Sequence, residues 1–459
     1  MTGICGLIGQ DSDDLESEAK NILALMRRRG SESRTFQHSV GNGEKIAIGV
    51  CDSTMAQPFT HETMPLALDG VFFPDYEGPR KTGPAGPSRL IQTPGAFAFL
   101  ISLQDQLVAG RDIIGQKPLY FGRGPRGAVA FASLRAPLLS MGVREPEPVP
   151  PGKVIGATGR GYYTLNDYSL KQPEEESIDE SDATRTLDGL FTEAIRRIVP
   201  RGSGIAFSGG LDSSLVAHVA NNEGLDPELI SVGLKGQQEL AHADRTAKNF
   251  GLHLDIKELS SSEIIDSLPD VVDTIETIDP VIVGISIPIY FACQKAREIG
   301  LHYIAVGQLS DELFGGYGKF EEIAVHAGIE NLGREMFDSV VAASVKDFDP
   351  GDKLAVAAGL EFCCPFAYLP LVEYVLKLPT SLRVNLTGRK VIRKYVLRRL
   401  AAQLRLAQGV VDRPKKAVQY SSGVQKVLLK EAKRRGMSLG KMLEPFMGCV
   451  EDLSNGRLL

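Results

Sequence analysis

The residues best suited to chemistry in this chain form the heptad SGGLDSS, from Ser208 to Ser214. It follows the apolar run GIAF and precedes the apolar segment SLVAHVA, a pattern that predicts a strand, a glycine turn and a helix. Gly209 and Gly210 let the backbone approach a ligand closely, and a helix N-terminus presents unpaired N–H groups and partial positive charge. The hydroxyls of Ser208, Ser213 and Ser214 add donors, so the heptad predicts a phosphate-binding loop rather than an ordinary strand–helix turn.

Two aspartates indicate that a cation accompanies this phosphate. Asp212 lies inside the heptad, and a carboxylate beside a phosphate needs a hard cation such as Mg²⁺ between them. Asp311 lies in a second motif, GQLSDELFGGY at 307–317, which directly follows the apolar run HYIAV. Ligands bind at the carboxyl ends of strands in an open α/β sheet, so Asp311 would be the second metal ligand rather than a solvated loop charge. Together the two carboxylates and Mg²⁺ could hold a leaving pyrophosphate.

The elements around these motifs predict two domains. Residues 1–166 alternate short apolar runs with Gly- and Pro-containing turns, as in KIAIGV, GAFAFLISL and GAVAFAS, which indicates a β-rich domain. Residues 167–183 are acidic and broken by proline, which is typical of a linker. Residues 184–459 open with helical spacing and repeated strand–helix units, and become mostly helical after about residue 320. We expect an α+β domain followed by an α/β domain with a parallel sheet.

Length, composition and charge limit the classes of partner and the location to be expected for this protein. A length of 459 residues suits two domains, and 43% hydrophobic with 24% charged residues is typical of a soluble globular protein. No stretch approaches a membrane span and no secretory signal is visible. A net charge of −6 argues against nucleic acid. Six cysteines without a C-x-x-C pair fit a reduced cytoplasmic protein, in which Cys363 and Cys364 are buried thiols.

With both motifs in view, the chain resembles the glutamine-dependent asparagine synthetases along nearly its whole length. Further matching segments are SVGL at 231–234, IETID at 275–279, GLEFCCPF at 359–366 and RPKKAVQYSSG at 413–423. The resemblance implies an ATP-pyrophosphatase that uses ATP and Mg²⁺. It would activate a small-molecule carboxylate as an acyl-adenylate, release pyrophosphate, and let an amine donor form an amide.

The resemblance also assigns roles to individual residues. It places three residues along the nucleotide beside the heptad, namely Phe207, Val232 and Gly307. Asp212 and Asp311 would bind Mg²⁺. Lys415 or Lys416 would neutralise the charge that builds on the α-phosphate in the transition state, and Lys415 is the first choice.

The N-terminal domain resembles the family's N-terminal-nucleophile glutaminase, which implies a two-layer β-sandwich flanked by helices. The nucleophile should be a cysteine exposed by removal of the initiator methionine, but that register places Thr2 there, and using Cys5 would require removal of four residues. The expected substrate arginine is replaced by Ala47 or Ile48, the oxyanion-hole asparagine by Asp69, and an acidic residue around 80–92 is lost. We expect a vestigial glutaminase.

The synthetase domain keeps its phosphate chemistry and loses substrate-selecting groups. A glutamate near the attacking amine is replaced by Gln308, which cannot serve as a general base. Arginines of the family are replaced by Gly284 and by Cys363 or Cys364. We therefore expect an amide-forming ligase for aspartate or a related acid, using ammonia or an amine of the substrate itself, possible as a homodimer. Alternatives are a lactam- or peptide-cyclising synthetase, an RNA-modifying ATP-pyrophosphatase, or a non-catalytic regulator.

Overall fold

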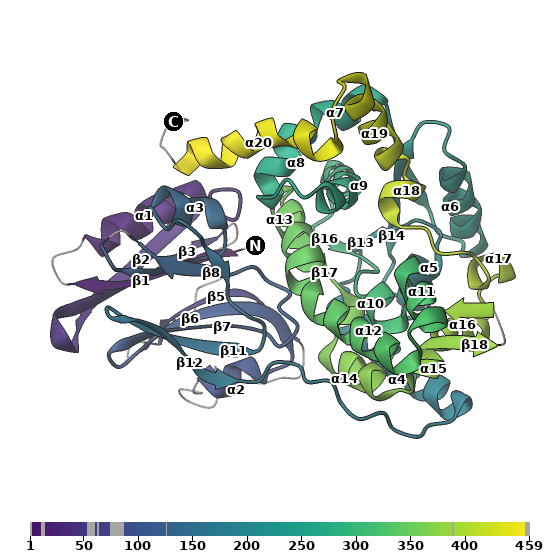
Figure 1. Ribbon diagram of the computed structural model, residues 1–459, viewed down its shortest axis with the longest axis horizontal. Coiled ribbons are helices and arrows are strands. Elements are labelled where there is room, and N and C mark those ends of the chain that lie inside the picture. The colour runs from purple at the N-terminus through teal and green to yellow at the C-terminus, as the bar shows by residue number, and fades with distance from the viewer. Residues whose placement is uncertain are drawn as a thin grey trace. The chain divides into compact units, whose positions relative to one another are not determined.

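The computed structural model of this protein (Figure 1) describes residues 2–10, 14–52, 60–61, 64–73, 87–124, 126–387 and 390–454. These residues form two compact units. Unit 1 comprises residues 1–170, 272–278 and 443–459, and unit 2 comprises residues 171–271 and 279–442. The sequence-based boundary at the linker falls close to the change of unit at Lys171, whereas the short segment 272–278 and the C-terminal helix could not be assigned to unit 1 from their sequence.

Unit 1 contains two antiparallel six-stranded sheets, ordered β10-β8-β9-β1-β3-β2 and β12-β11-β7-β6-β5-β4. Its elements are β1 Thr2–Gln10, α1 Leu15–Leu25, β2 Glu32–Val40, β3 Glu44–Asp52, β4 Thr60–His61, β5 Met64–Phe72, α2 Pro87–Ile91, β6 Gly95–Leu103, β7 Gln106–Arg111, β8 Tyr120–Arg123, β9 Val129–Ala132, α3 Arg135–Ser140, β10 Glu147–Pro148, β11 Lys153–Thr158 and β12 Gly161–Asp167. The expected β-rich domain is confirmed.

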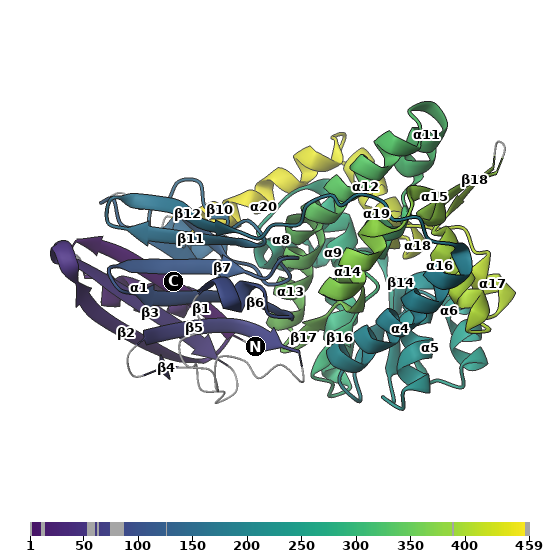
Figure 2. The ribbon, with the colours of Figure 1, turned by 90° about the horizontal axis from the view of Figure 1, so that it is seen from below.

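The alternation of apolar residues along the strands builds the layers of unit 1. In β3, Ile46 and Ile48 face the core between the two sheets, together with Ile4 of β1 and Leu100 of β6. The intervening Ala47 belongs to a second cluster under α1 and α3, on the outer face of the first sheet. A third cluster covers the other sheet beneath α2. The result is the predicted sandwich with flanking helices; Figure 1 shows its sheets as two layers, and Figure 2 shows the strands of the second sheet side by side from β12 to β4.

Unit 2 is built on a parallel five-stranded sheet, ordered β15-β14-β13-β16-β17. Its first elements are α4 Glu180–Ile198, β13 Gly204–Ala206, α5 Leu211–Asn222, β14 Glu228–Leu234, α6 Gln238–Asn249, β15 Leu254–Leu259, α7 Ser261–Asp266, α8 Leu268–Ile275, α9 Pro280–Glu298 and β16 Tyr303–Ala305. From β13 the chain proceeds through β14 to β15, and then returns to place β16 on the other side of β13. Because such crossovers are right-handed, α5 and α6 cover one face of the sheet and α9 the other.

This reversal determines where a ligand binds. The order of strands changes direction between β13 and β16, and a crevice opens there at the carboxyl ends of the strands. The SGGLDSS loop follows β13 and the GQLSDELFGGY motif follows β16. The two motifs singled out in the sequence therefore meet at one edge of the sheet.

The remainder of unit 2 is mostly helical, as expected, but adds sheet strand β17 and a hairpin of β18 and β19. Its elements are α10 Ser310–Phe314, α11 Gly318–His326, α12 Ile329–Ala343, the π-helical turn Ser344–Phe348, α13 Asp349–Ala357, β17 Glu361–Cys363, α14 Leu369–Lys377, α15 Thr380–Arg383, β18 Val384–Thr387, β19 Lys390–Arg393, α16 Tyr395–Gln403, α17 Gln408–Val411, α18 Val418–Ser421, α19 Val424–Arg434 and α20 Leu439–Ser454. Within the described ranges no single helix is long and apolar enough to cross a membrane; Ser261–Ile275 with Pro280–Glu298 reaches that length only as a pair bent by 105°.

Candidate active site

The SGGLDSS loop forms the glycine turn between a strand and a helix that its sequence predicts. Backbone N–H of Ser208 donates to Ser213 Oγ at 3.2 Å, and N–H of Gly210 donates to Ser208 Oγ at 3.2 Å. Gly209 has a φ of +65°, and a Cβ there would lie 3.0 Å from the Ala243 Cα of α6, so the turn needs glycine. The loop is therefore a tight turn at the start of α5.

Ser214 differs from the other serines of the heptad. Its side chain is fully buried, and its hydroxyl has no hydrogen-bond partner among the described residues. It lines none of the cavities described below, whereas Ser208 and Ser213 do. Of the three serines predicted to bind phosphate, Ser208 and Ser213 therefore line cavities in the crevice, whereas Ser214 does not.

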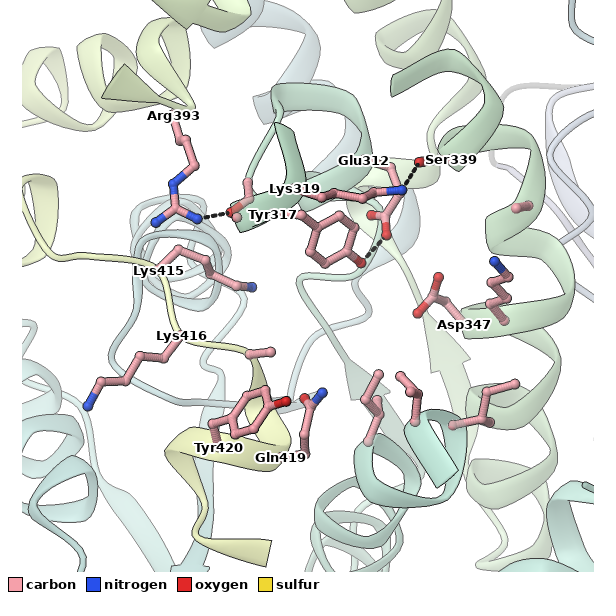
Figure 3. Close-up of a pocket in the computed structure, with 18 of the residues that line it drawn as sticks. Glu312, Tyr317, Lys319, Ser339, Asp347, Arg393, Lys415, Lys416, Gln419 and Tyr420 are labelled. Atoms are coloured by element: carbon pink, nitrogen blue, oxygen red, sulfur yellow. Dashed lines mark hydrogen bonds between the residues drawn. The ribbon is translucent and has the colours of Figure 1, made fainter. Parts of the chain in front are cut away.

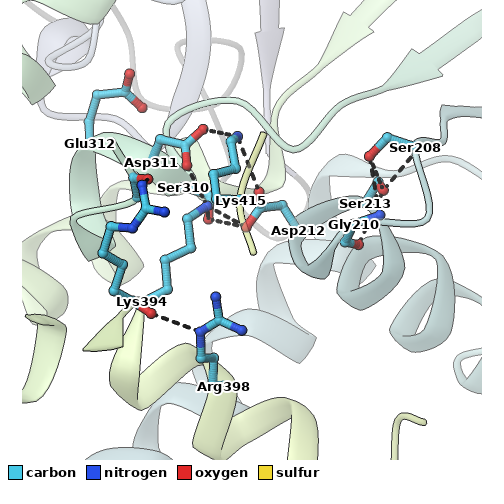
Figure 4. A network of polar contacts seen from close by, with 12 residues as sticks. Ser208, Gly210, Asp212, Ser213, Ser310, Asp311, Glu312, Lys394, Arg398 and Lys415 are labelled. Carbon is cyan, nitrogen blue, oxygen red and sulfur yellow. Dashed lines mark hydrogen bonds and ion pairs between the residues drawn. The ribbon is translucent and has the colours of Figure 1, made fainter. Parts of the chain in front are cut away.

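The two aspartates predicted as metal ligands face each other across the crevice. Lys394 Nζ lies between them, 2.6 Å from Asp212 Oδ1 and 2.7 Å from Asp311 Oδ1. Lys415 Nζ contacts Asp311 Oδ2 and lies 3.8 Å from Asp212 Oδ2. Ser310 donates its hydroxyl to Asp212 Oδ1 at 2.7 Å. Figure 4 shows this network, in which two carboxylates are held by two ammonium groups.

The electrostatic surroundings of Asp311 favour its ionised form. Burial opposes the charge on Asp311, but Lys394 and Lys415 outweigh it and hold its pKa far below the ordinary range. The same carboxylates raise the pKa of Lys415 against the opposing effect of burial. Two carboxyl side chains with the Ser310 hydroxyl beside them are an oxygen donor set that fits Mg²⁺. The 1%-exposed ammonium of Lys394 between them shows that this position already requires a cation.

Backbone strain and small residues support this arrangement. Lys394 has a φ of +56° and Leu309, which precedes α10, has a φ of +70°. Such left-handed residues are held by their surroundings and cluster at functional sites. A Cβ at Gly316 would lie 1.9 Å from Asp311 Oδ1 and 2.4 Å from Lys394 Cε. The second glycine of the ELFGGY segment is therefore required by the close approach of the ion-pair network.

Lys415 and Lys416 have different surroundings. Lys415 faces the aspartates with 22% of its side chain exposed, whereas Lys416 is 60% exposed and pairs with Glu239 at 2.6 Å. In Figure 3 the two amines point to different sides of the chain segment that carries them, with Lys415 toward Tyr317. This geometry favours the first choice made from the sequence.

Three cavities follow the crevice from the sheet outward. The nucleotide slot, of about 70 Å³, includes Phe207, Ser231 and Val232 in its lining and is mainly apolar. The phosphate groove, of about 50 Å³, lies between the loop residues Ser208 and Gly210 and a set of cations comprising Lys394, Arg398, Arg413, Lys415 and Lys416. The junction cavity, of about 170 Å³, includes Asp212, Gly307, Gln308, Asp311 and Lys415. Phe207 and Val232 therefore line the first of these cavities and Gly307 the third, and their contact with a nucleotide stays a prediction.

Three carboxylates line the far side of the junction cavity: Asp311, Glu312 and Asp347. Glu312 is 4% exposed and accepts a hydrogen bond from the Tyr317 hydroxyl. Burial, and then the charge of Asp311, raise the pKa of Glu312. Burial and the charges of Glu312 and Asp311 raise the pKa of Asp347 well above its usual value. Gln308 Nε2 donates to Asp347 O at 3.5 Å, while Gln308 Oε1 is buried without a hydrogen-bond partner among the described residues.

Several of these residues were not found from the sequence. Lys394 and Arg398 belong to a basic stretch that has the pattern of an exposed helix face, and Arg413, although it opens the RPKKAVQYSSG segment, was given no role there. Asp347 lies in the π-helical turn, 36 positions after Asp311 on the chain, with no motif around it. Nothing in their spacing signals the site, because only the fold brings them to the crevice.

The predicted glutaminase pocket in unit 1 is organised differently. Arg29 Nη2 and Asp69 Oδ2 form an ion pair at 2.7 Å, and each side chain is 2% exposed. Arg29 Nε also donates to Thr2 O at 2.8 Å. Arg29 therefore balances the charge of Asp69, which replaces the oxyanion-hole asparagine expected from the resemblance. The stretch 80–92, in which an acidic residue of the family is expected to be lost, lies partly outside the described residues.

Cys5 is excluded as a nucleophile in this structure. It is fully buried in β1, which is paired with β3 on one side and β9 on the other. Burial, and then the neighbouring Cys51, raise the pKa of the Cys5 thiol far above its ordinary value. Burial likewise raises the pKa of Cys51 to about 11. Neither thiol is activated.

Gly284 and Cys363 or Cys364 stand where the resemblance expects arginines of the synthetase site. Gly284 is buried in α9, and a Cβ there would meet Gln425 Oε1 at 2.9 Å rather than a cavity. Cys363 and Cys364 are buried.

Comparison with known proteins decides the family. The Asparagine synthase family matches residues 186–346 and 324–441, which together span more than half of the chain. The chain belongs to the asparagine synthase family. It is an ATP-dependent carbon–nitrogen ligase of the asparagine synthase type, as the sequence predicted. The Glutamine amidotransferase domain family matches residues 81–140.

Relatives of this asparagine synthase-family chain extend over nearly its full length. A Methanocaldococcus jannaschii protein, provisionally named a glutamine-hydrolysing asparagine synthetase, is 30% identical over 95% of this chain and 89% of that protein. The glutamine-hydrolysing asparagine synthetase B of Escherichia coli is 27% identical over 92% of this chain and 82% of its own length. The glutamine phosphoribosylpyrophosphate amidotransferase structure from B. subtilis matches 75% of this chain and 92% of its own at 12% identity, with a TM-score of 0.30, too low to bear on the fold.

Proposed function

We propose that this asparagine synthase-family protein activates a carboxylate with ATP and transfers the acyl group to an amine. A carboxylate oxygen of the acid attacks the α-phosphorus, the bond from that phosphorus to the bridging oxygen breaks, and pyrophosphate leaves with it. The amine then displaces AMP to give an amide. Aspartate or a related acid is the substrate class, and ammonia or an amine of the substrate itself is the nucleophile.

The observation that carries this proposal is the position of Lys415. It lines the phosphate groove and the junction cavity at once, and it is held on Asp311. A cation at this point can meet the charge that develops on the α-phosphate. Bound Mg²⁺ would supply further positive charge for the leaving pyrophosphate, with Asp212 and Asp311 as its ligands. Phe207, Val232 and Gly307 would line the nucleotide.

Groups for the amide-forming half-reaction lie on the other side of Lys415. Gln308 Oε1, which is buried without a hydrogen-bond partner among the described residues, can accept an N–H of the amine. Gln308 cannot take the proton. Glu312 and Asp347 can, because a carboxylate with a raised pKa is a better base near neutral pH than an ordinary one.

We further propose that residues 1–166 form an amidotransferase-like domain without glutaminase activity, joined through 167–183 to the synthetase domain at 184–459. Thr2 in place of a cysteine and the closed Arg29–Asp69 pair support this. A cytoplasmic location and a homodimer stay predictions from the sequence.

Pyrophosphate release with ATP and Mg²⁺ tests the function, using a panel of carboxylates that includes aspartate, with either ammonia or glutamine. We expect acid-dependent release that ammonia supports and glutamine does not. Asp212→Ala should abolish the release. Release that continues in Asp212→Ala would overturn the site assignment, and release supported equally by glutamine would overturn the vestigial glutaminase.

A further inference from the structure

One cavity in unit 2 lies beside the proposed site of chemistry. It has a volume of about 760 Å³, and its lining comes from α9, α12, the π-helical turn and the segment around Lys415. We call it the acid cavity, and Figure 3 shows it from close by. The argument about its ligand rests on the proposed function.

The acid cavity and the junction cavity share part of their lining. Ile285, Glu312, Asp347 and Lys415 belong to both. A molecule in the acid cavity can therefore present one end to Lys415 and the phosphate groove. Its remaining body would lie between α9 and α12, away from the nucleotide slot.

The volume exceeds what a small acid and ammonia need. Ligand pockets of roughly 300–1,000 Å³ enclose drug-sized molecules. Ammonia is about as large as water, whose share of liquid volume is roughly 30 Å³. Aspartate, with four carbons, would leave most of the 760 Å³ cavity empty.

The lining is also poorly suited to the α-carboxylate, which aspartate carries in addition to the carboxylate that is activated. Apolar side chains of Val281, Ile282, Ile285, Ala342 and Ala417 cover much of the wall. Cations at its edge already have partners: Lys319 pairs with Glu335 at 2.7 Å, and Arg393 donates to Gly316 O at 2.9 Å. Lys346 forms no ion pair with any described residue, but it is exposed and lies next to Asp347.

The polar groups near Lys415 are hydrogen-bond acceptors. Asp279, Glu312 and Asp347 offer oxygen acceptors, and Lys415 is the cation that acts on Glu312 and Asp347, so this end of the cavity has a place for one carboxylate. Gln419 is 8% exposed, and its Oε1 is buried without a hydrogen-bond partner among the described residues. It can accept an N–H from a bound molecule.

We propose that the acid cavity takes a monocarboxylic acid with an extended apolar body, in preference to aspartate. Its carboxylate would meet Lys415, and its body would displace water from Ile282, Ile285 and Ala342. Burial of each further methylene in such a wall favours the longer acid.

ATP–pyrophosphate exchange with acetate, aspartate, butyrate, octanoate and decanoate, each at one concentration, tests the proposal. We expect exchange to rise with chain length, with octanoate or decanoate at least about tenfold above aspartate. Exchange highest with aspartate and falling with chain length would overturn the inference while leaving the proposed function intact. If none of the five acids supports exchange, the proposed function itself would be overturned.

A cavity-filling variant locates the binding site. Ala342→Phe narrows the acid cavity, whereas Val341→Phe adds the same ring at the neighbouring position, which is 44% exposed and outside the lining. We expect Ala342→Phe to reduce octanoate-dependent exchange about tenfold more than acetate-dependent exchange, with Val341→Phe unchanged for both. Equal octanoate exchange in Ala342→Phe and the parent protein would overturn the inference.

Calorimetric titration of decanoate without nucleotide adds a readout that does not depend on turnover. The parent protein and Val341→Phe should bind it, and Ala342→Phe should not. If thermal unfolding shows that Ala342→Phe is not folded, Ile282→Trp fills the same wall from α9 and takes its place.

Discussion

Charged residues meet in both units, but they are arranged in opposite ways. In unit 1, Arg29 and Asp69 are 2% exposed and neutralise each other inside the sandwich. In unit 2, Asp311 and Lys415 also pair, yet both line cavities. There, burial and then the charge of neighbouring carboxylates raise the pKa values of Glu312 and Asp347.

This difference separates a structural ion pair from a reactive one. A buried pair whose members satisfy each other has no charge left for a ligand, and removing one member leaves the other uncompensated. A cluster of carboxylates and lysines at a cavity holds charge that a phosphate or an amine can reorganise. We therefore propose that unit 1 keeps only the fold of an amidotransferase domain, whereas unit 2 keeps the groups for chemistry.

The largest effect should follow from removing Lys415. Lys415→Ala should lower ATP–pyrophosphate exchange roughly 100- to 1,000-fold, the range for losing one preorganised charge at the transition state. The matched control is Lys416→Ala, which removes an exposed pair with Glu239 and should cost less than roughly threefold. Equal losses in both variants would show that Lys415 is not distinguished by its place in the crevice.

Next in size is the stability cost of opening the buried pair in unit 1. Arg29→Met leaves Asp69 buried without its partner, and should lower the free energy of unfolding by about 3–5 kcal/mol in urea titrations. The double variant Arg29→Met with Asp69→Leu should recover most of this loss. A stable Arg29→Met protein would break the comparison, because the pair would then lack a structural role.

The raised pKa of Asp347 predicts a smaller, pH-dependent effect. The folded protein keeps this proton above the ordinary carboxyl range while the unfolded chain releases it, so stability falls as pH rises toward the raised value. Asp347→Asn cannot ionise. When the pH is raised from about 5 to about 8, the Tm of the parent protein should therefore fall. The Tm of Asp347→Asn should fall by a few degrees less over the same range. Parallel Tm curves would show that Asp347 ionises normally.

The smallest effect is expected at Thr2. Thr2→Ala should change ammonia-supported pyrophosphate release by less than roughly twofold, because it alters only one side chain of unit 1. Glutamine should support release in neither protein. Glutamine-dependent release that disappears in Thr2→Ala would show instead that Thr2 is a working nucleophile.

Much of the architecture could be predicted from the sequence. The alternation in segments such as GAFAFLISL predicted the β-rich unit, and the strand–glycine–helix pattern predicted the parallel sheet. The assignment of residues 272–278 to unit 1 could not be predicted. There Glu276 accepts the N–H groups of Arg135 and Ala136 at 3.0 and 2.6 Å, a contact between positions about 140 residues apart.

By itself, the sequence determined the family and the two phosphate-end motifs, because glycines, serines and aspartates at fixed spacing carry their chemistry locally. Only the tertiary structure decided what surrounds them. The strand order places β13 beside β16 and so joins Asp212 to Asp311. The left-handed backbone at Lys394 brings a further lysine between them, and helices distant in the chain enclose the acid cavity. These features depend on contacts across the fold, and short-range residue patterns contain no record of such contacts.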